Sequence, residues 1–219
     1  MPNPVYYQAQ RPELTEFIPQ QYSKVLEIGC GEGYFRRNLM QKHEYWGVEA
    51  EPSIADKAKS ILDTVVVGPY DTVSEEIPNH YFDLIICNDV IEHMVDHVWF
   101  LEHIKTKLAK KGHLILSIPN ARLLSNINHF LFGRDWQYRE SGILDHTHLR
   151  FFTKKSLENV LNDCNWKINK LKGINRYGAR DGGPRLLLSY LAQLVYGPDS
   201  AYWQFAAQIT VNQTLSADD

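Results

Sequence analysis

Apolar runs alternate with stretches of helical periodicity along residues 22–120 of this 219-residue chain. Five short runs are largely apolar and lie between turn signals, which is typical of buried strands. They cover residues 24–28, 45–49, 64–67, 82–87 and 113–118. Three intervening segments have apolar residues at helical spacing, and they cover residues 31–41, 52–62 and 98–108. This alternation predicts a parallel sheet covered by helices on both faces.

The last third of the chain follows a different pattern. Residues 121–148 are aromatic and irregular, and a connection of this length predicts a functional lid. Helices are predicted over residues 153–162, N-capped by the first of them, and over residues 184–196. We expect residues 166–174 and 203–211 to form an antiparallel pair of strands at the edge of the sheet.

The whole pattern predicts a single α/β domain over residues 1–219. Its doubly wound, mostly parallel sheet would have seven strands, with an irregular aromatic lid. Four parts are expected within it. They are a capping helix in residues 1–21, the core 22–120, the lid and acceptor region 121–148, and the closure of the sheet by 149–219.

Composition excludes several classes of protein. The chain is 44% hydrophobic with a net charge of −3, so an overall nucleic-acid binder is not expected. Its three cysteines lie far apart and form no Cys-x-x-Cys motif, which argues against a disulfide framework or a zinc knuckle. The longest apolar stretch, residues 186–196, is too short to span a bilayer, and the first residues do not resemble a signal peptide. We therefore expect a cytoplasmic protein.

Charge is distributed unevenly along the chain. Residues 1–100 hold 7 Lys/Arg and 16 Asp/Glu, a net charge of −9, which would suit a cationic ligand. Residues 150–185 hold 9 Lys/Arg and 3 Asp/Glu, a net charge of +6. This basic segment would suit a phosphate-bearing ligand, or it is simply a solvated surface.

A glycine-rich loop follows the first predicted strand, in the run Glu27-Ile-Gly29-Cys-Gly31-Glu-Gly33. Glycines at a strand-to-helix turn let a ligand approach the backbone. Glu49 ends the next strand, where a carboxylate can accept hydrogen bonds from both hydroxyls of a ribose. Glu27 would repel a pyrophosphate but would suit an ammonium or sulfonium group.

Together with three further stretches, this loop resembles the class I S-adenosylmethionine-dependent methyltransferases, which have a Rossmann-like fold. The resemblance lies in residues 25–33, 49, 82–94 and 112–120. It implies S-adenosylmethionine as the cofactor of the core 22–120. The residues that it implies for cofactor binding are Glu27, Gly29, Gly31, Gly33, Glu49, Asn88 and, near the adenine, Asp71.

A cluster of potential ligands follows the fourth strand. Asp89, Glu92 and His93 are spaced i, i+3 and i+4, so one helical turn would place them on one face. Two carboxylates and an imidazole can bind a divalent cation such as Mg²⁺. A histidine from the later run Asp145-His146-Thr-His148 would complete the set.

Three roles for these histidines stay open. His93 and His148 are metal ligands, or one of His93, His146 and His148 is a general base without a metal, or all are structural. Methyltransferases of small-RNA 2′-hydroxyls and of ubiquinone-precursor catechols are similar here, with Glu-x-x-Glu-His and a later histidine. Asp89 stands where they have the first glutamate.

The acceptor is predicted to be a small molecule that carries a hydroxyl. Residues 142–153 resemble bacterial methyltransferases of sugar and glycan clusters, which favours a sugar or glycan precursor, either with or without a phosphate. A catechol or secondary-metabolite O-methyltransferase is the first alternative, and a non-catalytic cofactor-binding module is the second. A homodimer is left open.

Overall fold

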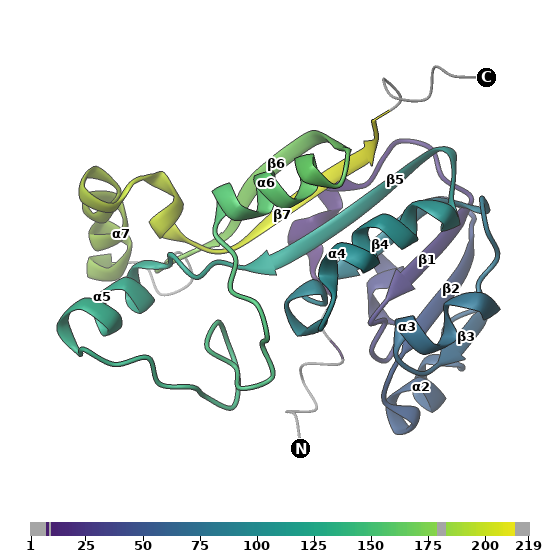
Figure 1. Cartoon of the computed structure of the whole chain (residues 1–219), viewed down its shortest axis with the longest axis horizontal. Helices are drawn as coiled ribbons and strands as arrows, with labels where there is room; N and C mark the ends of the chain where they lie inside the picture. The colour runs from purple at the N-terminus through teal and green to yellow at the C-terminus, as the bar shows by residue number, and fades with distance from the viewer. Residues whose placement is uncertain (1–7, 9, 179–182, 213–219) are drawn as a thin grey trace.

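A computed structural model describes residues 8, 10–178 and 183–212 of the chain. Its sheet has seven strands in the order β3-β2-β1-β4-β5-β7-β6 (Figure 1). They are β1 (Lys24–Ile28), β2 (Glu44–Glu49), β3 (Thr64–Val67), β4 (Phe82–Asn88), β5 (Leu108–Pro119), β6 (Trp166–Arg176) and β7 (Tyr202–Val211). Strands β1 to β5 pair in parallel, and β7 runs antiparallel between β5 and β6. The predicted doubly wound sheet is confirmed.

The α-helices connect these strands or extend beyond them. They are α2 (Pro52–Ala58), α3 (Tyr70–Val73), α4 (His97–His103), α5 (Leu124–Phe132), α6 (Lys154–Asp163) and α7 (Gly183–Tyr196). Short 3₁₀ helices complete the described chain. They are η1 (Pro12–Phe17), η2 (Tyr34–Asn38), η3 (Ser74–Glu76), η4 (Ile91–His93), η5 (Ile104–Lys107) and η6 (Pro198–Ala201). Thr153 caps α6 with a capping box, as its position before the helix predicts.

Two apolar clusters lie on opposite faces of the sheet. Alternate residues of β4 belong to different clusters, since Ile85 faces one and Leu84 faces the other. The first cluster includes Phe100 of α4 and Leu157 of α6, and the second includes Phe35 of η2. Burial on both faces explains why the strands are apolar without alternation.

Several predicted segments were wrong in their helical content. Residues 31–41 form only the short η2, because Gly31 and Gly33 have φ of 54° and 85°, and no α-helix begins in that conformation. The helix expected over residues 98–108 ends at His103, and the chain tightens into η5 and enters β5 at Leu108, which pairs with Phe82.

The third correction concerns the lid. Residues 121–148 are not irregular throughout, since α5 occupies the start of this stretch, while residues 130–142 are all exposed. A capping helix was expected in residues 1–21. The described part of this segment contains the 3₁₀ helix η1 instead, and residues 1–7 and 9 are not among the described residues.

The carboxyl ends of β1 and β4 lie next to each other at the centre of the sheet, where the chain order reverses. In doubly wound sheets, ligands bind outside the carboxyl ends of the strands at this switch point. The glycine loop follows β1, and the predicted cluster of ligands follows β4. The fold thus brings both sequence motifs to one edge.

Among the helices in the described ranges, we find none with the length and apolar character required to cross a membrane.

Candidate active site

The glycine loop is held against the end of β2. The backbone N–H groups of Gly29 and Cys30 both donate to the carbonyl of Val48, at 2.8 and 3.1 Å. Gly29 has φ of 69°, and a Cβ there would lie 2.8 Å from Cγ2 of Val90, which follows β4. A side chain at this position would therefore strain the backbone and push against the neighbouring loop.

The carboxylate of Glu49 links the glycine loop to the chain after β2. It is buried and accepts hydrogen bonds from the N–H of Gly31 at 2.9 Å and from the N–H of Glu51 at 3.0 Å. An acidic side chain at the end of the second strand therefore lies in contact with the glycine loop. Its role towards a ribose stays a prediction.

Glu27 is a buried carboxyl group at the same edge. The Tyr45 hydroxyl donates a hydrogen bond to Oε2 of Glu27 at 2.7 Å. Burial raises the pKa of Glu27 to about 8, the Tyr45 hydroxyl opposes this rise, and the negative charge of Glu49 adds to it. A cation bound at this edge would favour the ionised form of Glu27.

Two further residues predicted to bind the cofactor have different surroundings. The side chain of Asn88 ends β4 with both its amide nitrogen and its oxygen buried and without a hydrogen-bond partner. Buried polar atoms are rarely left unpaired, so Asn88 is a candidate to bind a ligand. Asp71 is exposed in the first turn of α3, after β3.

Arg11 reaches this edge from the N-terminal segment, which sequence reasoning did not foresee. Its guanidinium forms ion pairs with Asp89 at 2.5 Å and with Glu13 at 2.7 Å, and it donates to the hydroxyl of Ser117 at 3.3 Å. Residues 1–100 are acidic and contain seven Lys/Arg residues, of which Arg11 is one. This scarcity of cations was the sequence signal that could have indicated a role for Arg11.

Asp89 is separated from the other predicted ligands that follow β4. Its φ of 53° interrupts the helical turn assumed from the sequence spacing. Its carboxylate is occupied by Arg11, by the Ser117 hydroxyl at 2.8 Å and by the amide of Gln204 at 2.6 Å. The predicted grouping of Asp89 with Glu92 and His93 is therefore not what the geometry shows.

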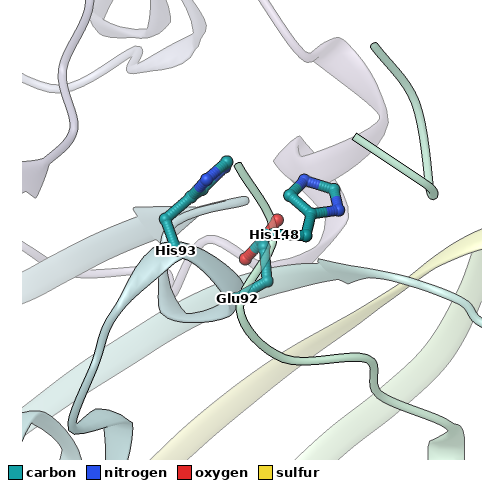
Figure 2. Close-up of side chains that lie close together, drawn as sticks. All are labelled: Glu92, His93 and His148. Atoms are coloured by element: carbon teal, nitrogen blue, oxygen red, sulfur yellow. The ribbon is translucent and has the colours of Figure 1, made fainter. Parts of the chain in front are cut away.

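Glu92, His93 and His148 lie together, and their side chains converge in Figure 2. One potential ligand atom from each lies within 4.8 Å of the others, and the two imidazole rings are 4.7 Å apart. The backbone N–H groups of Leu149 and Arg150 donate to the carbonyl of Glu92, at 2.8 and 3.0 Å. These bonds join two segments more than 50 residues apart in sequence.

Both imidazoles have one nitrogen fixed by the backbone of the lid. Nδ1 of His148 lies 2.9 Å from the carbonyl of Ile143, and Nδ1 of His93 lies 3.2 Å from the carbonyl of Thr147. A carbonyl can only accept, so in each ring we assign the proton to Nδ1. Nε2 is then left with a lone pair that can take a proton or bind a metal.

His146, the third candidate, lies outside this group. Its Nδ1 is 3.3 Å from the carbonyl of Arg139 and 3.6 Å from the carboxylate of Asp145, and its side chain is exposed. Asp145 instead shapes the local turn, because it accepts from the N–H and the hydroxyl of Thr147.

Burial controls the charge of this cluster. Burial, and then the negative charge of Asp89, raises the pKa of Glu92 well above its usual range. Burial, and then the neighbouring His148, lowers the pKa of His93. Both carboxylate oxygens of Glu92 are buried without a hydrogen-bond partner. A buried carboxyl group with no donor beside two imidazoles is suited to a bound cation.

Comparisons with known proteins define the class. Residues 6–171 match the family model described as a methyltransferase domain, so the chain belongs to this family, as its motifs predicted. One curated relative is a mitochondrial ubiquinone biosynthesis O-methyltransferase from Schizosaccharomyces pombe. It is 27% identical over 158 residues, which cover 69% of this chain and 57% of the relative.

A second relative, a ubiquinone biosynthesis O-methyltransferase from Rickettsia bellii, is 28% identical over 160 residues. These residues cover 69% of this chain and 64% of the relative, so the matches span about three fifths of each relative's length.

The fold is that of S-adenosylmethionine-dependent methyltransferases. A solved structure of such a protein from Archaeoglobus fulgidus superposes with a TM-score of 0.68 over 94% of both chains, at 14% identity. This likeness confirms the Rossmann-like fold that the sequence resemblance implied.

Proposed function

We propose that the protein transfers a methyl group from S-adenosylmethionine to a hydroxyl of a small-molecule acceptor. One observation carries this proposal. A glycine loop that is hydrogen-bonded to Glu49 and two histidines whose Nε2 atoms can accept a proton lie at the same edge of the sheet. The unpaired amide of Asn88 lies at the end of β4, and in the sequence it stands between the glycine loop and the two histidines.

The cofactor would be held by its charges and its ribose. Glu49 would accept hydrogen bonds from the ribose hydroxyls, and Glu27 would face the cationic methionine end. Asn88 would satisfy its buried amide on the cofactor. Asp71 is the residue that we propose near the adenine, on the exposed turn after β3.

The acceptor would lie on the other side of the histidines. Phe151 lies 6.4 Å from the ring of His148, and Trp136 contacts Phe151 edge to face at 5.2 Å. Such a wall suits a planar phenolic acceptor, and the relatives named as ubiquinone biosynthesis O-methyltransferases favour the same class. We therefore place the catechol type ahead of the sugar hydroxyl expected from the sequence.

Methyl transfer to oxygen is an in-line displacement that leaves a proton on the acceptor. The residues of the edge would align the acceptor oxygen with the methyl carbon and exclude water. Nε2 of His148 would take the hydroxyl proton, because its other nitrogen is already held by Ile143.

As the alternative to a general base, the same cluster fits a divalent cation, and Nε2 of His148 would then be a ligand of the ion and would not take the proton. Glu92, His93 and His148 would hold it, and the buried unpaired oxygens of Glu92 are the observation that supports the fit. When bound, such an ion lowers the pKa of a hydroxyl that it contacts. Asp89 is not included, because Arg11 occupies its carboxylate.

Glu92→Gln should abolish most divalent-cation binding, with a loss in Mn²⁺ affinity of at least about 100-fold. The amide removes the negative charge while conserving the size of the side chain. Asp89→Asn is the matched control and should retain Mn²⁺ affinity, because Arg11 already occupies the carboxylate of Asp89. Both affinities can be measured by calorimetry. Equal losses in the two variants would restore Asp89 to the set of ligands, and no binding by the wild type would remove the metal.

Glu49→Ala should weaken the binding of S-adenosylhomocysteine by about 1.5–3 kcal/mol, since hydrogen bonds to a charged group are lost. Glu51→Ala is the matched control, because Glu51 is exposed and caps α2. Isothermal titration with both variants checks this assignment. An unchanged affinity in Glu49→Ala would show that Glu49 only holds the glycine loop.

The reaction itself is tested by incubating the protein with S-adenosylmethionine and two acceptor panels, catechols and nucleotide sugars, each with Mg²⁺ or EDTA. Production of S-adenosylhomocysteine with catechols supports the proposal, whereas turnover only with sugars would return the acceptor to the earlier expectation. Cofactor binding without turnover on any hydroxyl would favour a non-catalytic module.

A further inference from the structure

Helices α5 and α7 pack against each other at one end of the molecule, beyond the carboxyl end of β5 (Figure 1). Their outer side carries large apolar side chains. We define the α5–α7 face by five of them, Phe132, Leu187, Leu191, Leu194 and Val195. Leu194 is 84% exposed, Val195 76% and Phe132 75%.

The α5–α7 face is larger than the apolar patches that monomers usually expose. At about 200 Å² for a large apolar side chain, the exposed fractions of the five residues give roughly 700 Å². The largest patch on a typical monomer is about 300–600 Å². One side of a standard protein interface buries about 800 Å², so the face has close to the area that a stable dimer needs.

The spacing within α7 is that of a packing seam. Leu187, Leu191 and Leu194 are spaced i, i+4 and i+7, which places them along one side of the helix. In a globular protein this side faces a core, but here these three leucines face solvent. A second helix with the same stripe would interdigitate with it.

The charge of the two helices favours a second copy of the chain over a lipid surface. Helices that lie on membranes have a polar face rich in Lys and Arg. The sequence of α7 contains one arginine, no lysine and no acidic residue, and α5 contains none of these residues.

We propose that the α5–α7 face is the interface of a homodimer. The two α7 helices would pack antiparallel about a two-fold axis near Leu191, the middle of the stripe, so that each copy covers the apolar face of the other. Because α5 belongs to the stretch 121–148, the dimer would also cover the outer side of the segment that leads to His148.

The double variant Leu191→Glu/Leu194→Glu should weaken self-association by at least about 100-fold, because it buries unpaired charges in the interface. Light scattering or sedimentation from micromolar to millimolar concentration should give twice 25.4 kDa for the wild type and 25.4 kDa for the variant. Met40→Glu is the control, since Met40 is 93% exposed outside the face and should leave the dimer intact. A monomeric wild type, or a double variant that still dimerises, would overturn the proposal.

A cross-link tests the same interface without charged substitutions. The three native cysteines, Cys30, Cys87 and Cys164, are buried and free, so a new surface cysteine can be oxidised selectively. Leu191→Cys should form a covalent dimer on oxidation, whereas Met40→Cys should not. Failure of Leu191→Cys to cross-link would contradict the placement of the axis. Flotation of a monomeric protein with phosphatidylglycerol vesicles would show instead that a membrane covers the face.

Discussion

Replacing His148 with alanine is expected to lower the rate of methyl transfer by about 10²–10⁴-fold, the usual contribution of a general base. His148 is buried and its Nδ1 is fixed by the carbonyl of Ile143, so Nε2 is the nitrogen left to take a proton. The residues that we propose to bind the cofactor, Glu27, Glu49 and Asn88, are unaltered, so the affinity for S-adenosylhomocysteine should stay close to that of the wild type. Single-turnover assays and calorimetry on the same preparation measure the two quantities.

Two other histidine variants make this test specific. His129→Ala removes an imidazole of α5 and should leave the rate unchanged. His146→Ala should also retain most activity, because its exposed ring faces the carbonyl of Arg139 rather than the cluster. Partial recovery of His148→Ala by added imidazole would support proton transfer. A fully active His148→Ala would assign His148 a structural role, and a loss only in His146→Ala would reverse the assignment of the base.

Most strands of the sheet could be predicted almost to the residue, with the exception of β5, which begins five residues before its predicted start, and the helices between β1 and β5 could not. Residues 24–28 and 64–67 are strands with the predicted bounds, because burial on both faces requires continuous apolar runs. Helical spacing over residues 31–41 was misleading, since the positive φ values of Gly31 and Gly33 delay the start to Tyr34. Apolar spacing indicates which face is buried, but it does not report the backbone angles of the loop before it.

The candidate site also has parts that the sequence could predict and parts that it could not. Glu27, the glycine loop and Glu49 could be placed together from sequence, because adjacent parallel strands end at one edge. The meeting of His148 with Glu92 was also expected, although its cause, the hydrogen bonds from residues 149 and 150 to the Glu92 carbonyl, is a long-range contact. The position of Asp89 was not predictable, because it depends on its φ of 53° and on its ion pair with Arg11.

Glu27 is expected to make the stability of the fold depend strongly on pH. Burial raises its pKa from 4.5 to about 8, so between these values the folded chain retains a proton that the unfolded chain releases. The stabilisation is therefore complete below pH 4.5 and is lost as the pH rises through about 8. At 1.36 kcal/mol for each unit of pKa, this difference is about 4–5 kcal/mol.

Glu27→Gln should remove this dependence, because the amide does not titrate and its oxygen can still accept from the Tyr45 hydroxyl. Relative to the wild type, the free energy of unfolding of Glu27→Gln should rise between pH 5 and pH 8.5, as urea titrations at several pH values would show. A constant difference across this range would mean that Glu27 is already ionised in the folded chain. A bound ammonium or sulfonium would favour the carboxylate, so below pH 8 the wild type should release a proton when it binds S-adenosylmethionine. Calorimetry in buffers of different ionisation enthalpy would detect that proton, and its presence in Glu27→Gln would assign it to another group.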